Sequence, residues 1–170
     1  FSWTKQVASH FGGTSQGVCV SWPGHIKDVG AVRNQFHHII DIVPTILEAC
    51  AIKAPETVDG IKQKPIEGTS FAYTFDQANA KVPSHHKTQY FEMMGDHAIY
   101  NDGWIASTKV VRPPWITSGP VNQDPVNNVT WELYDLSKDP TQCNDLAASN
   151  KAKVNELKAL FHSEAKKYSV

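Results

Sequence analysis

The sequence predicts an α/β protein in which the end of a large sheet is followed by a small antiparallel sheet and a C-terminal helix. Two observations indicate this order. In the first half, an apolar run at 18–22 precedes an apolar helical pattern at 42–50. In the second half, four short runs rich in aromatic and β-branched residues precede a run with helical period that begins near residue 150. A helix packed across an antiparallel sheet makes a stable two-layer unit.

Residues 1–52 are predicted to form the last strand and helix of a larger α/β domain. The run at 18–22 stands between glycine and proline residues, as is typical of a short buried strand. The helix begins near Asp41, whose carboxylate can accept the free N–H groups of the first turn. Pro44 stands early in this helix, where its missing N–H is best tolerated. These elements do not close on themselves, so we expect further strands in a portion of the protein outside this chain.

The rest of the chain is predicted to be a linking loop region at 53–88 and a sheet-and-helix subdomain at 89–170. Proline and glycine recur in the loop region, which has one helical turn near 70–75. Gly95-Asp96 and Asp102-Gly103 separate the first three strand-like runs, and Asp-Gly between strands strongly indicates a hairpin. Apolar residues of the final helix share one face: Val154, Leu157, Leu160, Phe161 and Ala165.

Composition excludes several classes of function. The chain has 170 residues, with 16 basic and 17 acidic side chains and a net charge of −1. The basic residues are scattered, which argues against a nucleic acid partner. No run approaches the ~20 apolar residues that a membrane span requires. The three cysteines are far apart, which argues against a disulfide framework or a zinc site and favours thiols that fill the core. The cellular compartment is left open.

Three stretches of the chain resemble the type I sulfatases (arylsulfatases) of the alkaline-phosphatase-like superfamily. HIIDIVPTILEA at 38–49 is similar to their H-x-x-D-x-x-P-T-L-L motif. WELYDLSKDPTQCNDLA at 131–147 is similar to their C-terminal strand, turn and helix lead-in. KQVASHFGG at 5–13, followed by SWPG, resembles the lysine and paired glycines of their sulfate pocket. The resemblance implies an alkaline-phosphatase-like α/β fold and the C-terminal portion of a sulfatase.

The resemblance also implies cofactors that this chain does not supply. Type I sulfatases use a formylglycine made from a C/S-x-P-x-R motif, and a calcium ion that polarises the sulfate. None of the three cysteines starts such a motif, and no metal ligands are expected among these residues. The implied partner is therefore the N-terminal portion of the same enzyme, which would bring the nucleophile and the calcium ligands. We expect the 170-residue chain to be inactive alone.

Lys5 and His10 are the candidate catalytic residues. The resemblance places the Lys5 ammonium against the oxygens of a sulfate ester, where it would stabilise negative charge. Gly12-Gly13 would let the backbone turn tightly beside it. A histidine such as His10 can protonate a leaving alkoxide or phenoxide. The alternatives are a solvated lysine and a hydrogen-bonded loop histidine.

His97 and Trp104 are the candidate substrate-binding residues, because the family's C-terminal sheet lies near the rim of the pocket. The alternative is that both belong to the core, as aromatic residues on such a sheet usually do. The segment 113–115 is a further rim candidate. His38 is expected to have a structural role at the helix start rather than to bind a metal, and the polar loop that contains His86 is expected to be solvated.

Two other functions remain open from the sequence. One is hydrolysis of a phosphate or phosphonate ester by an enzyme of the same superfamily, which only the nucleophile motif would distinguish. The other is a non-catalytic binding module, whose aromatic sheet would hold a sulfated polymer or a partner chain.

Overall fold

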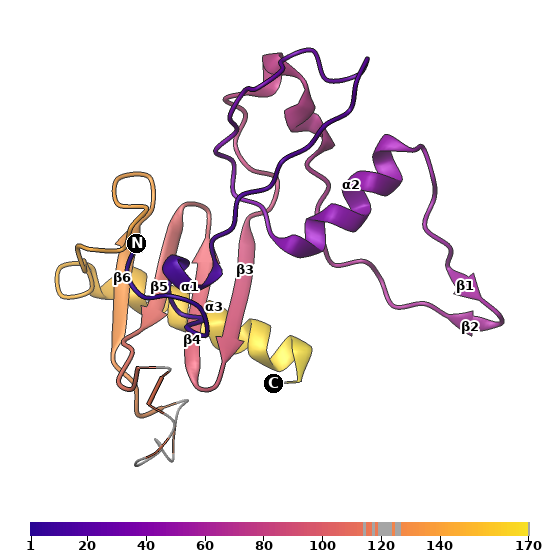
Figure 1. Cartoon of the computed structure of the whole chain (residues 1–170). Helices are drawn as coiled ribbons and strands as arrows, with labels where there is room; N and C mark the ends of the chain where they lie inside the picture. The colour runs from indigo at the N-terminus through magenta and orange to yellow at the C-terminus, as the bar shows by residue number, and fades with distance from the viewer. Residues whose placement is uncertain (114, 117, 119–123, 125–126, 170) are drawn as a thin grey trace. The chain divides into compact units, whose positions relative to one another are not determined.

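The chain divides into two compact units, which are described separately. A computed structural model of the protein describes residues 1–113, 115–116, 118, 124 and 127–169 (Figure 1). Unit 1 comprises Phe1–Gly17 and Thr88–Val170, and unit 2 comprises Val18–Lys87. The domain boundaries after residues 52 and 88 remain predictions. None of the helices in the described ranges combines the length and apolar content needed to cross a membrane.

Unit 1 is built on a four-stranded antiparallel sheet with the strand order β3-β4-β5-β6. The strands are β3 (Thr88–Met93), β4 (Asp96–Asn101), β5 (Trp104–Thr108) and β6 (Trp131–Asp135). Two-residue turns join these strands: Met94-Gly95 connects β3 to β4, and Asp102-Gly103 connects β4 to β5. Both residues of each turn have positive φ. The predicted sheet is confirmed, although the first turn lies one residue earlier than expected and Asp96 already belongs to β4.

Helix α3 (Lys151–Tyr168) covers one face of this sheet, as predicted. Leu157 and Phe161 are fully or almost fully buried, at 0% and 3% exposure, in a cluster with Ile99, Leu133 and Trp131. Burial of each such side chain contributes roughly 1.5–3 kcal/mol. The apolar period of the helix therefore fixes which side of the helix faces the sheet.

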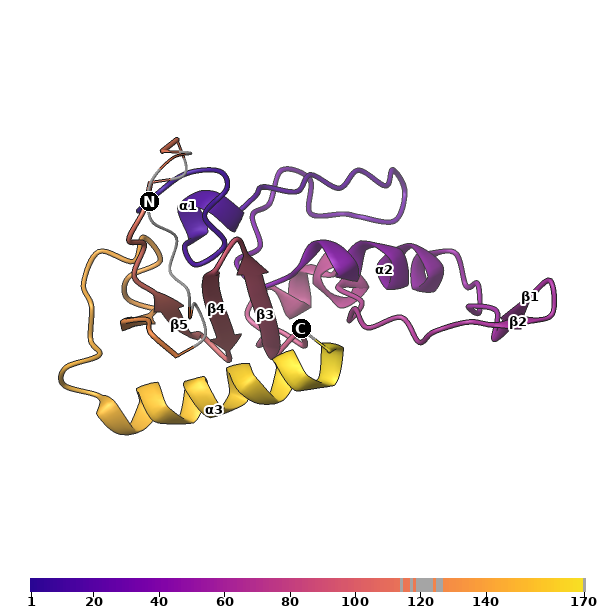
Figure 2. The same cartoon turned by 90° about the horizontal axis from the view of Figure 1, so that it is seen from below.

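The N-terminal segment Phe1–Gly17 covers the opposite face of the sheet. Its short helix α1 (Phe11–Thr14) and helix α3 lie on opposite sides of the strands (Figure 2). Phe11 packs against the buried cluster of Ala98, Ile105 and Tyr134. The sheet is thus buried on both faces by segments that are far apart in sequence.

Unit 2 consists of short elements joined by long connections. They are the 3-10 helix η1 (Ile39–Asp41), the helix α2 (Ile42–Ala49), the hairpin strands β1 (Thr57–Val58) and β2 (Ile61–Lys62), and the 3-10 helices η2 (Ala72–Phe75) and η3 (Gln77–Asn79). The predicted helical turn near 70–75 corresponds to η2. The β1–β2 hairpin was not predicted, although Asp59 and Gly60 at its turn both have positive φ.

The predicted strand at 18–22 is wrong for this structure. Val18 and Val20 are 63% and 46% exposed, and these residues have no regular secondary structure. A strand forms only where a second strand pairs with its N–H and C=O groups, and no described strand pairs with this segment. The expected apolar face of α2 is also largely uncovered: Ile46 is 55% exposed, whereas Thr45 is buried.

The cysteines do not fill the core, contrary to expectation. Cys19, Cys50 and Cys143 are all exposed free thiols. Cys19 lies in the segment after Gly17 that forms no strand, Cys50 lies at the end of α2, and Cys143 lies in the loop after β6. In all three places most described side chains are exposed.

Candidate functional site

Lys5 lies in a tight turn of the N-terminal segment. Trp3 and Gln6 on either side of it have positive φ values of 64° and 75°, an uncommon conformation for residues with side chains. The Lys5 side chain is exposed, and it forms no ion pair with a residue that the structure describes. The turn therefore presents an unpaired ammonium group on a constrained backbone.

Gly12 and Gly13 allow α1 to pack directly on this turn. A Cβ at Gly12 would lie 2.2 Å from the carbonyl oxygen of Trp3, and one at Gly13 would lie 2.1 Å from that of Val7. These distances are far inside van der Waals contact, and both neighbours are backbone atoms that cannot swing away. The paired glycines therefore hold the backbone around Lys5 by close approach.

Gln142 connects the N-terminal segment to the sheet. This residue is 2% exposed and has a φ of 58°. Its Oε1 accepts a hydrogen bond from the backbone N–H of Phe11 at 2.6 Å, and its Nε2 donates to Ser107 Oγ at 3.1 Å. Its carbonyl oxygen accepts from Ser2 Oγ at 3.0 Å. Two of these contacts hold the chain on either side of the Lys5 turn, and the third anchors Gln142 to strand β5.

His10 is buried at 1% exposure, and both of its ring nitrogens have partners. Its Nε2 lies 3.2 Å from Glu132 Oε2, and its Nδ1 lies 2.9 Å from Ser9 Oγ. The Tyr134 hydroxyl donates to the same Glu132 oxygen at 3.0 Å. This network joins the segment that contains Lys5 to strand β6.

The electrostatics of the network follow from these contacts. The hydrogen bond from His10 lowers the pKa of Glu132 and outweighs the opposite effect of burial. Burial raises the pKa of Tyr134, and the nearby Glu132 charge raises it further. Burial also raises the pKa of Asp96, while His10 and Arg112 oppose that effect. Glu132 is therefore a stable carboxylate that orients the imidazole of His10.

His97 and Trp104 lie on the other face of the sheet. His97 is 4% exposed, and its ring meets the Phe161 ring edge-on at 4.9 Å between centroids. Burial lowers its pKa. Trp104 is half-buried against the cluster that includes Leu157. The structure does not bring these two residues together with Lys5 and His10. Their contact with a substrate stays a prediction, and their position against α3 does not favour it. In the rim candidate 113–115, Pro114 lies outside the described residues and Trp115 is 66% exposed.

A second buried cluster is centred on Asp41 in unit 2. The Asp41 carboxylate has no exposed surface and accepts from His38 N–H at 2.8 Å and Thr69 N–H at 2.7 Å. It also lies 2.8 Å from His86 Nδ1. Burial alone would raise the pKa of Asp41, but the bonds from His86, His38 and Thr69 together lower it. The cluster ties η1 to loops that follow 28 and 45 residues later.

Two sequence-based expectations about this cluster need correction. Asp41 stands at the N-cap position of α2, but its side chain makes no capping bond to the first turn and bonds instead to His38 and Thr69. His86 was expected to be solvated, yet it is 5% exposed and paired with Asp41. No local pattern in a polar loop indicates such a partner, because the pairing depends on tertiary structure.

The described residues do not supply a metal site. In the ranges that the structure describes, no group of three or more His, Cys, Asp or Glu side chains is arranged to hold an ion. The described residues therefore offer no set of ligands that fits the calcium ion implied by the sulfatase resemblance.

Comparison with known proteins adds structural relatives. No protein-family model matches the chain. A Bacteroides thetaiotaomicron sulfatase designated BT33336S-sulf matches at 20% identity and a TM-score of 0.50, over 77% of this chain and 25% of its own. The sulfatase Ps i-CgsB matches at 22% identity and a TM-score of 0.55, over 87% of this chain and 27% of its own.

The chain has the fold of the C-terminal part of a sulfatase. The predicted resemblance is thereby confirmed at the level of the fold, including the antiparallel sheet and its C-terminal helix. The chain spans about a quarter of the length of the sulfatases that it matches.

Proposed function

We propose that this chain is the C-terminal part of an enzyme that hydrolyses sulfate esters of aryl or carbohydrate compounds, and that Lys5 is its contribution to the sulfate pocket. The observation that supports this most directly is the Lys5 turn, which paired glycines and Gln142 hold in place within a sulfatase fold. An unpaired ammonium on a constrained backbone is suited to bind an oxyanion.

The proposed role of Lys5 is electrostatic. Cleavage of a sulfate ester leaves negative charge on the sulfate oxygens and builds charge on the leaving oxygen. A pre-positioned ammonium stabilises this charge most strongly where water is excluded. Formylglycine and calcium, when present, would supply the attacking oxygen and polarise the sulfate from another portion of the protein.

His10 is proposed to position the Lys5 segment. Direct protonation of a leaving group by His10 would require its Nε2 to leave Glu132, and its ring is almost fully buried. A buried imidazole fixed by Ser9 and Glu132 is better suited to hold the backbone that leads to Gly12. Replacement of His10 by Gln should therefore lower turnover without shifting the acidic or basic limb of the pH–rate profile.

The test uses the longer protein that would contain this chain, with 4-nitrophenyl sulfate as substrate. Lys5→Ala should reduce turnover more than ~100-fold, as expected for loss of one charge stabiliser. Lys64→Ala, another exposed lysine, is the control and should leave turnover unchanged. A near-normal rate for Lys5→Ala would remove Lys5 from the site. Sulfatase activity of the 170-residue chain alone, or preference for 4-nitrophenyl phosphate, would contradict the proposed division of roles or the proposed reaction.

A further inference from the structure

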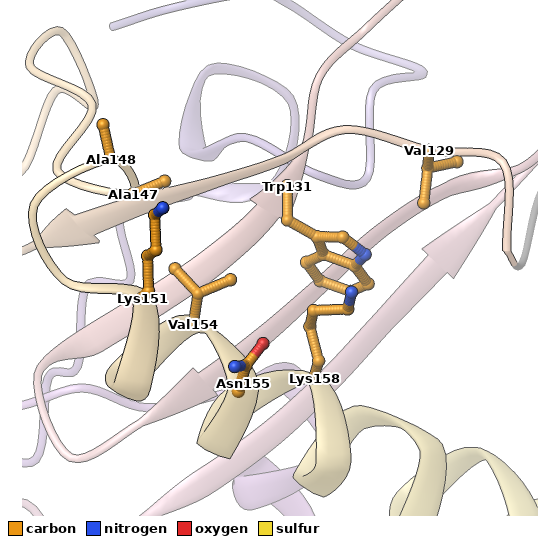
Figure 3. A pocket seen from close by; sticks show the side chains of 8 residues that line it. All are labelled: Val129, Trp131, Ala147, Ala148, Lys151, Val154, Asn155 and Lys158. Carbon is orange, nitrogen blue, oxygen red and sulfur yellow. The ribbon is translucent and has the colours of Figure 1, made fainter.

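A cavity of about 370 Å³, wide open to solvent, lies between strand β6 and the first half of helix α3 (Figure 3). Its lining comprises Val129, Trp131, Ala147, Ala148, Lys151, Val154, Asn155 and Lys158. The cavity is on the face of the sheet that α3 covers, whereas His10 and Glu132 are on the opposite face. It is therefore separate from the candidate sulfate site.

The helix presents four cavity residues from a single face. Lys151, Val154, Asn155 and Lys158 follow the spacing i, i+3, i+4 and i+7, which places them one above another along α3. The two lysines are two helical turns apart, or about 10 Å along the axis. Because lysine has a long flexible stem, both ammonium groups can reach one anion above Val154 and Asn155.

The cavity has uncompensated positive charge. Neither Lys151 nor Lys158 forms an ion pair with a described residue, whereas Lys153 on the same helix pairs with Glu156 at 2.7 Å. The lining contains two lysines and no carboxylate, although the chain as a whole has a net charge of −1. This local excess of positive charge favours an anionic ligand.

The indole of Trp131 adds a neutral donor to the same cavity. Trp131 is 8% exposed, and its N–H makes no hydrogen bond to any residue within the described part of the chain. The N–H is not one of the buried side-chain donors left without a partner, so it is open to solvent at the cavity wall. Figure 3 shows the indole ring between Val129 and the Lys158 side chain, at the wall of the cavity. An acceptor atom of a ligand could replace water at this donor.

We infer that this cavity binds a small ring compound that carries a sulfate or phosphate monoester. The oxyanion would lie between Lys151 and Lys158 and accept from the Trp131 N–H, while the apolar side of the ring packs on Val129 and Val154. The size of the cavity is in the range of small-molecule sites, roughly 300–1,000 Å³. Two lysines in a concave pocket do not form the basic stripe that nucleic acids require. The inference does not depend on the proposed sulfatase function.

The test is a titration of the full chain followed by NMR of the tryptophan side-chain N–H signals, with Trp131→Phe used only to assign the Trp131 signal. The probes are glucose 6-sulfate, glucose 6-phosphate and glucose. We expect a saturable shift of the Trp131 signal with at least one ester and none with glucose. Comparison of the two esters identifies which oxyanion is preferred.

Variants of the lysines locate the binding to the cavity. Lys151→Ala and Lys158→Ala should each weaken ester binding roughly tenfold, since each removes a charge-assisted contact. Lys166→Ala, in the last turn of the same helix, is the matched control and should leave binding unchanged. The inference is overturned if neither ester gives a saturable shift, if glucose shifts the signal equally, or if the variant lacking both cavity lysines binds the ester as tightly as the parent chain.

Discussion

The Oε1 of Gln142 accepts a hydrogen bond from the backbone N–H of Phe11 at 2.6 Å, although 131 residues separate the two in sequence. Both groups are buried or half-buried, so neither can exchange this partner for water without local unfolding. The contact makes the position of the Lys5 turn depend on the loop that follows β6.

Gln142→Ala should lower the free energy of unfolding by about 2–3 kcal/mol. The substitution leaves the Phe11 N–H and the Ser107 hydroxyl without their buried partner, which has a larger effect than loss of a solvated bond. Urea denaturation followed by circular dichroism measures the change. Gln63→Ala is the control, because the exposed Gln63 side chain bonds to nearby Ile61 and to no other residue that the structure describes, and it should change stability by less than ~0.5 kcal/mol. Equal effects of the two variants would contradict the role of Gln142.

Gly12→Ala should destabilise the N-terminal segment by roughly 3 kcal/mol or more, because its Cβ would lie 2.2 Å from the carbonyl oxygen of Trp3. Gly17→Ala is the matched control, since a Cβ there meets no described atom within 4 Å apart from those of its chain neighbours. Hydrogen exchange of backbone amides in the N-terminal segment reports the effect. If the amides near Val7 keep their protection in Gly12→Ala, the proposed close approach is incorrect.

Asp41→Asn should destabilise unit 2 by roughly 3 kcal/mol at pH 7, because it removes a buried carboxylate paired with His86. The contacts lower the pKa of Asp41 below its ordinary value of 3.8. Stabilisation by a carboxylate with a lowered pKa is complete above that ordinary value and is lost as the pH falls through the folded-state pKa. The difference between the two proteins should therefore shrink below about pH 3.8.

Hydrogen exchange of the Thr69 amide, a direct partner of Asp41, measures this change locally. Asp59→Asn is the control, because Asp59 is exposed in a turn with a φ of 50° that asparagine also adopts. A constant difference between Asp41→Asn and the parent chain down to pH 2 would show that the charge of Asp41 does not stabilise the cluster.

The chain should lose stability as the pH falls below about 6.5, the ordinary pKa of histidine. Burial lowers the pKa values of His37, His38 and His97, so these side chains bind protons more readily in the unfolded chain. Stability from such groups is complete above the unfolded-state pKa and is lost as the pH falls toward the folded-state values. Urea denaturation between pH 5 and 8 measures the slope.

His97→Leu separates one contribution to this slope. The variant keeps an apolar side chain against Phe161 and removes one titrating group. Its free energy of unfolding should depend less steeply on pH below about 6.5 than that of the parent chain, and both should show the same slope above pH 7.5. Parallel curves across the whole range would rule out His97 as a source of the acid sensitivity.

The sequence predicts the parts of this fold that depend on local chemistry. The strands from Thr88 to Thr108 and the helix from Lys151 follow from alternation, turn residues and helical period, which are properties of neighbouring residues. The segment 18–22 has the same apolar character but forms no strand, because strand formation also requires a partner. Local pattern therefore predicts an element reliably only where its partner is adjacent in the chain.

For the candidate sites too, local sequence patterns predict only contacts between residues that are close in the chain. Gly12-Gly13 next to Lys5 is a local pattern, and the close approach of the glycines to that turn agrees with it. The pairing of His86 with Asp41, across 45 residues, has no local pattern that predicts it. The sulfatase resemblance predicts His97 and Trp104 at the rim of the pocket, whereas the two-residue alternation of the strands places both toward α3.

The insertion of Val18–Lys87 between the two parts of unit 1 has a consequence for the order of folding. Ser2 bonds to Thr141 and Gln142, so its partners are synthesised about 140 residues later. On a translating ribosome the Lys5 turn cannot settle until β6 and the loop after it have emerged. Closure of contacts so far apart in sequence slows folding.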